Sequence, residues 1–327
     1  MNQLRYLVAI VDAGLVISRA AERVHTTQSA LSKQLKQIET EMGQPLFQRR
    51  GYALSALTPC GSRVIEHARA VLAEMSGIHG LALHRRGGMS RALRIATTPT
   101  QARYVLPAAL ERLKREHSQL QVSLTVGGDE EVLAWAESGR IDLALASTPG
   151  LRPRHVASVP LYRWQRLALV PLRHPLLRLG RGLRIADLAA QPIVTYESAR
   201  DPLSDFARAF AVHGLRPNLA TLSGDADLIK AYVRAGLGIG IVAETAYRRD
   251  SDDDLCALPV GELFRTCTAW AAFPARTSPA EPALELVADL APHMEIRAMR
   301  RTLALGEAGE WPVPPGWASV AQRAVAA

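Results

Sequence analysis

Two groups of polar side chains lie where a ligand could bind. The first lies on a segment whose apolar residues recur at the spacing of a helix. Its members project together from one side of a helix: Gln28, Ser29, Ser32, Lys33 and Lys36. Amides and hydroxyls can read base edges in the major groove of DNA, and lysines neutralise phosphates. The group predicts a DNA-binding face, while a solvated polar face on an ordinary helix is the alternative.

The second group consists of Thr98, Thr100 and Gln101, where a predicted strand ends and a predicted helix begins. Unpaired backbone N–H groups, the positive end of the helix dipole and hydroxyl donors converge at such a position, which suits an oxyanion or a carboxylate. Simple N-capping by either threonine would also explain hydroxyls there.

Three short helices are predicted to position the first group. Apolar spacing predicts helices over residues 2–12 and 18–24, and Thr27 can cap a third that carries the polar face. A short helix, a tight turn and such a third helix form a helix-turn-helix. Two extended runs around Arg50-Gly51 then predict a hairpin wing, whose basic residues Arg49 and Arg50 would contact the DNA backbone or minor groove.

A long linker helix is predicted next, beginning after Thr58-Pro59. Its apolar seam comprises Val64/Ile65, Ala68, Val71/Leu72, Met75 and Ile78. This seam suits a helix of about 28 residues, roughly 40 Å long, that pairs with a partner chain. A core helix is the alternative. Arg85-Arg86-Gly87-Gly88 predicts a hinge.

From Leu93 onward short strands alternate with helices, which predicts an α/β domain with parallel sheets. The expected strands are 93–96, 121–126, 142–146, 167–170, 193–195, 219–222 and 239–242, and the expected helices are 101–116, 130–137, 203–212 and 226–235. The Pro/Gly/Ala-rich tail is expected to be poorly ordered. The predicted domains are 1–58, the linker 59–90, an effector domain 91–303 and a tail 304–327.

Composition bounds the class of protein. The chain has 327 residues, 48% hydrophobic and 21% charged, with a net charge of +8, and residues 1–90 carry an excess of five positive charges. This distribution favours an anionic partner such as nucleic acid. Because the sequence shows neither a membrane-spanning run nor a signal-peptide pattern, we expect the chain in the cytoplasm.

Several features predict no further chemistry. Cys60, Cys256 and Cys267 are too widely spaced for a metal site or a disulfide framework, and no catalytic triad can be assembled, so no cofactor and no enzymatic activity are expected. Gly236-Leu237-Gly238 indicates a helix stop, because it follows a helix and precedes a strand. Asp252-Asp253-Asp254 is expected to be a solvated loop rather than a metal site.

The N-terminal residues resemble the LysR-type transcriptional regulators, and the resemblance extends over about residues 1–300. The matching runs are Ala20–Arg23, Thr27–Leu35, Ile38-Glu39, Gly43–Phe47 and Leu57–Pro59. The resemblance implies a winged helix-turn-helix, a dimerising linker helix and a two-lobed α/β effector domain like that of periplasmic binding proteins. It also implies homotetramers built as dimers of dimers.

The effector domain is similar to the CysB-like branch of that family, which controls sulfur assimilation. The runs Ala96–Tyr104 and Asp225–Gly238 carry this similarity. The resemblance implies an oxyanion pocket formed by Thr98, Thr100, Gln101, Ser147 and Trp164. Asp201 stands where the branch has a pocket threonine, and Asp129-Glu130-Glu131 replaces a neutral segment.

These two departures change the expected ligand. If Asp201 faces the pocket, it repels a dianion, which favours a zwitterionic or mono-anionic metabolite such as a serine derivative over sulfate. If Asp201 points to solvent, this argument does not apply.

The sequence thus predicts a regulator of transcription, in sulfur or cysteine metabolism. The DNA-binding set is Thr27, Gln28, Ser29, Ser32, Lys33, Lys36, Arg49 and Arg50. The expected partners are double-stranded promoter DNA, a small anionic or zwitterionic metabolite, further copies of the chain and RNA polymerase, with no membrane. The alternatives are a LysR-type regulator of an unrelated pathway with a different carboxylate or zwitterionic inducer, and an enzyme or small-molecule-binding protein that uses the α/β domain.

Overall fold

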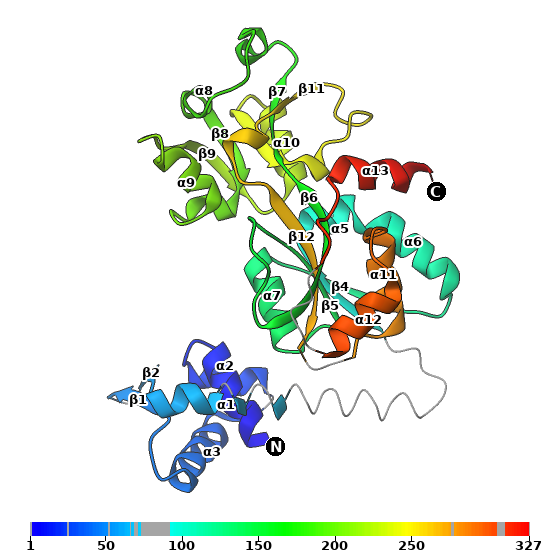
Figure 1. The fold of residues 1–327 in the computed structure, drawn as a ribbon. Helices are drawn as coiled ribbons and strands as arrows, with labels where there is room; N and C mark the ends of the chain where they lie inside the picture. The colour runs from blue at the N-terminus through cyan, green and yellow to red at the C-terminus, as the bar shows by residue number, and fades with distance from the viewer. Residues whose placement is uncertain are drawn as a thin grey trace. The chain divides into compact units, whose positions relative to one another are not determined.

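The chain forms two units, residues 1–89 and residues 90–327, and each is described by itself (Figure 1). The structure is a computed structural model, and it describes residues 2–24, 26–51, 53–65, 67–68, 71–72, 92–275, 278–305 and 311–326.

Three helices form the N-terminal unit: α1 (Asn2–Asp12), α2 (Ile17–Arg23) and α3 (Gln28–Glu41). Their apolar faces meet in one core, in which Leu7, Ala20 and Leu31 are buried. The hydroxyl of Thr27 accepts a hydrogen bond from the Ala30 N–H at 3.2 Å and so caps α3. The predicted helix-turn-helix is confirmed.

An antiparallel hairpin follows α3, formed by β1 (Phe47–Arg50) and β2 (Ala53–Leu57). The turn includes Gly51 at φ +65°, a left-handed conformation that glycine adopts without strain. The predicted hairpin around Arg50-Gly51 is therefore confirmed.

The start of the predicted linker helix is helical from Pro59 to Ile65. Thr58 Oγ1 accepts a hydrogen bond from the Gly61 N–H at 2.9 Å, which is the predicted cap. Ile65 packs into the core of the N-terminal unit, so the first seam position serves that core, whereas Val71 is 44% exposed. Residues 73–91 lie outside the described residues, and with them Met75, Ile78 and the predicted hinge.

Lobe 1 of the second unit is built on a sheet with strand order β4-β3-β5-β12-β6. Its strands are β3 (Leu93–Thr97), β4 (Val122–Val126), β5 (Leu143–Thr148), β6 (Val156–Trp164) and β12 (Cys267–Pro274). Lobe 2 is built on a sheet with order β11-β7-β10-β8-β9. Its strands are β7 (Arg166–Pro171), β8 (Pro192–Tyr196), β9 (Asn218–Ser223), β10 (Ile239–Ala243) and β11 (Leu255–Pro259).

Both sheets are mixed: they contain the predicted parallel strands and, in addition, antiparallel ones that the sequence did not predict. The strands β3, β4 and β5 are parallel, as are β8, β9 and β10, but β12 runs antiparallel to both β5 and β6. Likewise β7 runs antiparallel to β10 and β11. The chain passes from lobe 1 to lobe 2 between β6 and β7 and returns between β11 and β12. These connections are direct, without the crossover helix that a parallel pair requires.

Helices cover the sheets. In lobe 1 they are α5 (Pro99–Tyr104), α6 (Leu106–Glu116), α7 (Asp129–Glu137), α11 (Glu281–Leu290), α12 (Ile296–Leu305) and α13 (Trp317–Ala326). In lobe 2 they are α8 (Ile185–Ala189), α9 (Asp205–Ala211) and α10 (Ala226–Arg234), and 3₁₀ turns occupy 175–178, 197–200, 244–246 and 261–263. The predicted helix 101–116 is broken at Val105, because Pro107 lacks the N–H that would continue it.

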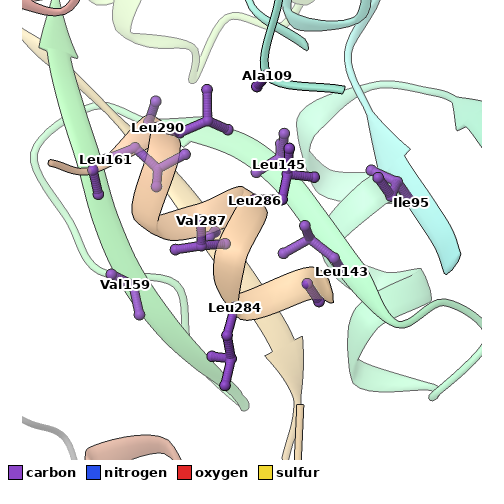
Figure 2. Close-up of a cluster of buried hydrophobic side chains, with 14 of the residues drawn as sticks. Ile95, Ala109, Leu143, Leu145, Val159, Leu161, Leu284, Leu286, Val287 and Leu290 are labelled. Carbon is purple, nitrogen blue, oxygen red and sulfur yellow. The ribbon is translucent and has the colours of Figure 1, made fainter. Parts of the chain in front are cut away.

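Alternating residues of β5 face two different layers of lobe 1. Leu143 and Leu145 pack with α6 and α11, whereas Ala144 and Ala146 pack with α7. Figure 2 shows α11 over the sheet, with Leu286 and Val287 directed at the strands. Both faces of the sheet are therefore buried at β5, and this packing fixes the end of β5, where Ser147 lies.

The C-terminal tail packs on lobe 1, so the expectation of a poorly ordered tail was wrong for residues 311–326. The indole Nε1 of Trp311 donates to the Ser158 carbonyl at 2.7 Å, and the Arg163 N–H donates to the Pro315 carbonyl at 2.8 Å. The rings of Trp317 and Tyr162 lie 4.9 Å apart, and Val320 is buried. Two tryptophans and a valine provide the apolar area that holds this Pro-rich segment.

Asp252 was expected in a solvated loop, but the structure buries it. It is 2% exposed, and its carboxylate lies 3.0 Å from Lys230 Nζ and 3.1 Å from Arg234 Nη2. Burial is tolerated because both cations compensate the charge. The predicted helix stop after α10 is confirmed, since Gly236 has φ +79°.

Among the described residues, no helix combines the length and the apolar character that crossing a bilayer requires.

Candidate DNA interface and effector site

Helix α3 divides cleanly into an apolar and a polar side. Leu31, Leu35 and Ile38 are buried in the core. The other side carries the predicted group: Gln28, Ser29, Lys33 and Lys36 are exposed, and Ser32 is half-buried. Within the described residues, neither lysine has an ion-pair partner. Their charges are therefore available for a phosphate backbone.

Thr27 has a structural task. Its hydroxyl caps α3 and lies 3.1 Å from the Ser29 hydroxyl. The geometry thus accounts for Thr27 as the residue that fixes the start of the polar face.

The two wing arginines differ in their surroundings. Arg49 is exposed, and its Nη2 lies 3.2 Å from Glu39 Oε2 on α3. Glu39 Oε1 also accepts hydrogen bonds from the Leu46 and Phe47 N–H groups, at 2.9 and 3.2 Å. Arg50 is exposed and makes no ion pair in the described part of the chain. Sequence reasoning missed the role of Glu39, which ties the hairpin to α3.

Four of the predicted effector residues meet at the edge of lobe 1. Trp164 Nε1 donates to Ser147 Oγ at 3.0 Å, and Gln101 Nε2 donates to the same oxygen at 3.5 Å. Thr98 caps α5, with its hydroxyl 3.5 Å from the Gln101 N–H. The residues come from α5 and from the ends of β5 and β6, so three separate chain segments form one polar cluster.

Thr100 joins this cluster to lobe 2. Its buried hydroxyl lies 3.4 Å from the hydroxyl of Tyr196, at the end of β8, and that hydroxyl accepts from the Ala243 N–H at 3.2 Å. Burial raises the pKa of Tyr196. Sequence reasoning did not assign Tyr196 to the site, although the residue follows directly on an apolar strand.

Asp129 lies on the other side of Ser147. It is the first residue of α7, and its Oδ1 accepts a hydrogen bond from the Ser147 N–H at 2.6 Å. Burial raises the pKa of Asp129 to about 6. The carboxyl group is therefore ionised at neutral pH but poorly solvated.

Arg166 places a cationic group beside the cluster. Its guanidinium lies 5.8 Å from the ring centre of Trp164 and 3.4 Å from Asp205 Oδ2. Arg166 begins β7, directly after the crossover between the lobes, and sequence reasoning did not assign it to the site.

Asp201 is the predicted residue that the structure does not bring into the cluster. It is exposed, and its Oδ1 accepts from the Leu203 N–H at 2.9 Å, which closes a local turn. Of the two orientations that the sequence left open, the structure shows the one toward solvent.

A second contact between the lobes lies at the other end of α5. Tyr104 donates to Oδ1 of Asp227 on α10, and Arg103 forms an ion pair with Oδ2 of the same residue. Lys230 Nζ lies 3.2 Å from Asp227 and 4.9 Å from the ring centre of Tyr104. Helix α5 therefore contacts lobe 2 at both of its ends.

Two family descriptions match the two units. "Bacterial regulatory helix-turn-helix protein, lysR family" matches residues 1–62, and "LysR substrate binding domain" matches residues 86–295. The chain belongs to the LysR family of transcriptional regulators. The recognised fold, a helix-turn-helix joined to a two-lobed α/β domain, is the one that the sequence predicted.

Several known proteins are similar to this chain over most of their own length. The HTH-type transcriptional regulator CysB of Haemophilus influenzae is 36% identical over 265 residues, 81% of each chain. SsuR of Burkholderia cenocepacia is 32% identical over 82% of this chain and 86% of its own. The crystal structure of the cofactor-binding domain of the Cbl transcriptional regulator has a TM-score of 0.59, with 28% identity over 66% of this chain and 94% of that one. These relatives are regulators, not enzymes.

Proposed function

We propose that this LysR-family regulator binds double-stranded promoter DNA through α3 and the β1–β2 hairpin, and that a small anionic or zwitterionic metabolite held by the cluster around Ser147 modulates this binding. The observation that carries the proposal is the exposed polar face of α3 on a helix-turn-helix, where Lys33 and Lys36, which form no ion pair with any described residue, lie beside hydrogen-bonding side chains.

On the DNA side, the residues divide by chemistry. Gln28, Ser29 and Ser32 offer amide and hydroxyl groups for base edges, whereas Lys33 and Lys36 neutralise phosphates. Arg50 at the hairpin tip contacts the DNA backbone or the minor groove. Arg49 makes the same kind of contact while its guanidinium stays paired with Glu39. Thr27 supports this set by capping α3.

On the effector side, Thr98, Thr100, Gln101 and Trp164 supply neutral donors around Ser147. Neutral donors at the junction of two lobes suit an acid group on a small ligand. The similarity to CysB and SsuR, together with the pathway that the CysB-like branch implies, supports a role in sulfur or cysteine metabolism.

The protein acts in the cytoplasm and associates with itself as a dimer and a tetramer, with RNA polymerase as a further partner. An apolar edge strand supports self-association, because Val122, Leu124 and Val126 of β4 are all exposed. A dimer would engage two half-sites of a pseudo-palindromic operator.

A regulator of a different pathway is the second candidate, and Asp129 is the observation that favours it. A carboxylate next to Ser147 is unsuited to a dianion such as sulfate. The two candidates share the DNA-binding function and differ only in the ligand.

Selection from a library of randomised DNA duplexes tests the proposal. The full-length protein is expected to enrich a sequence with dyad symmetry, and Gln28→Ala is expected to relax the preference at one position in each half-site. A Gln37→Ala variant, altered at another exposed position of α3, is the matched control. Recovery of no preferred sequence by the folded protein would contradict the proposal.

A further inference from the structure

The carboxylate of Asp129 shares its surroundings with the polar cluster. Oδ1 is held by the Ser147 N–H, while the Ser147 hydroxyl is held by Trp164 and Gln101. The charge of Asp129 also reaches Tyr196 and Tyr162, where it adds to the effect of burial and raises the pKa of both phenols. One serine therefore links the carboxylate to the groups that would hold the acid end of a ligand.

No cation among the described residues touches Asp129 directly, although the charge of Arg166 reaches it and favours its ionised form. Arg166 is paired with Asp205, which Arg265 also approaches at 3.7 Å. Asp129 makes no ion pair among the described residues, and the Ser147 N–H is its one hydrogen-bond donor there. Asp129 is half-buried, and its Oδ2 makes no hydrogen bond among the described residues.

From this arrangement we propose that Asp129 determines specificity at the effector site, by selecting a ligand that carries a protonated amine beside its acid group over one that is only an anion. The inference rests on the proposed function of the Ser147 cluster as the effector site. An ammonium group next to Asp129 would form a direct ion pair with its carboxylate, whereas a dianion in the same place would be repelled.

The geometry separates the two ends of such a ligand. Gln101 and Trp164 donate to the Ser147 hydroxyl, whereas Asp129 accepts from the Ser147 backbone N–H. A small amino acid or its ester would place its acid group among the neutral donors and its ammonium group against the carboxylate. An acylated amine carries no positive charge, so a ligand of that kind cannot form an ion pair with Asp129.

The preference is expected to depend on pH. The groups that face Asp129 are Arg166, Glu130, Tyr162, Tyr196 and Cys267. Since burial raises the pKa of Asp129 to about 6, the carboxylate is mostly ionised at pH 7 and mostly protonated at pH 5. Selectivity for the amine should therefore be present at pH 7 and lost at pH 5.

Calorimetry on the full-length protein tests this with a matched pair of isomers, O-acetylserine and N-acetylserine, and with sulfate. At pH 7 we expect O-acetylserine to bind at least tenfold more tightly than either of the others. Asp129→Asn keeps an oxygen that can accept from the Ser147 N–H but removes the charge. The substitution should therefore lower the affinity for O-acetylserine at least tenfold without lowering the affinity for sulfate. Glu130→Gln removes a neighbouring exposed charge and should change each affinity less than twofold.

Three results would overturn the inference: tighter binding of sulfate or N-acetylserine by the wild type, an undiminished preference for O-acetylserine in Asp129→Asn, or no binding of any probe to the folded protein. Binding of the same preparation to its selected duplex separates the two proposals. If the duplex binds, the inference about Asp129 fails while DNA binding by α3 stands; if it does not, the proposed function fails as well.

Discussion

Glu39 of α3 and Arg49 of β1 form an ion pair, with Oε2 and Nη2 3.2 Å apart, and the other oxygen of Glu39 accepts the N–H groups that begin the hairpin. One side chain of α3 therefore fixes both the hairpin and one of its arginines. In this way the helix and the wing can present a single surface to DNA.

Replacing Glu39 should disturb both stability and DNA binding. Glu39→Ala leaves the Leu46 and Phe47 N–H groups without their acceptor, at a cost of about 1–3 kcal/mol. Urea unfolding of the full-length protein, followed at the transition of the N-terminal unit, measures this cost. Glu41→Ala is the control, because Glu41 is exposed and its one hydrogen bond among the described residues is with Gln37. Equal stability of the two variants would contradict the role given to Glu39.

Lys33 and Gln28 should have separable effects on DNA affinity. Lys33→Ala should weaken binding to all sequences and reduce the slope of log K against log salt by about 1, because one phosphate contact is lost. Gln28→Ala should lower discrimination at one base pair by about 1–3 kcal/mol. Gel shifts over a salt series measure both. If neither variant differs from the wild type, α3 is not the recognition helix.

The carboxyl group of Asp129 should make the second unit less stable as the pH rises. Its pKa of about 6 lies above the ordinary value of 3.8, so the folded state binds the proton more tightly than the unfolded state. The favourable contribution is present below pH 4 and is lost as the pH rises through 6. The free energy of unfolding of Asp129→Asn should therefore equal that of the wild type at pH 4. At pH 7 it should exceed the wild-type value by roughly 1–3 kcal/mol. A difference that stays constant with pH would contradict this account.

The tail should contribute to the stability of lobe 1. Trp317→Ala removes the ring that packs on Tyr162 and should lower the free energy of unfolding by about 2–4 kcal/mol. Val313→Ala is the control, because Val313 is 74% exposed in the same segment. Thermal unfolding of the two variants compares them. A tail that does not pack would give the same melting temperature for both.

The sequence predicted elements whose signals are local. Helix α3 and the hairpin follow from apolar spacing, from the cap at Thr27 and from the glycine at the turn. It missed β6, β11 and β12, because these strands pair with partners far along the chain or arise at the crossovers between lobes. It also misjudged the tail, since composition suggested disorder while two tryptophans supply the packing.

At the effector site, the sequence predicted which residues lie together but not the direction in which each side chain points. Thr100, Gln101, Ser147 and Trp164 were predicted through the family resemblance, and the structure brings them together. The direction of Asp201 depends on a turn that local patterns do not specify, and the structure points it to solvent. The sequence shows Asp129 as an acidic residue in a segment that is neutral in the CysB-like branch. Its contact with Ser147 depends on the packing of α7 against β5, which the sequence does not show.

The central claim is that one chain couples a ligand at the Ser147 cluster to DNA binding by α3. Its most direct test is the affinity for the selected duplex, measured by fluorescence anisotropy with and without millimolar O-acetylserine. Coupling between two sites typically changes affinity about 5- to 150-fold. We predict a change of at least about fivefold in the wild type that is abolished in Thr100→Ala, while that variant keeps the ligand-free affinity. An affinity for DNA that does not respond to the ligand, or a response that persists in Thr100→Ala, would contradict the claim.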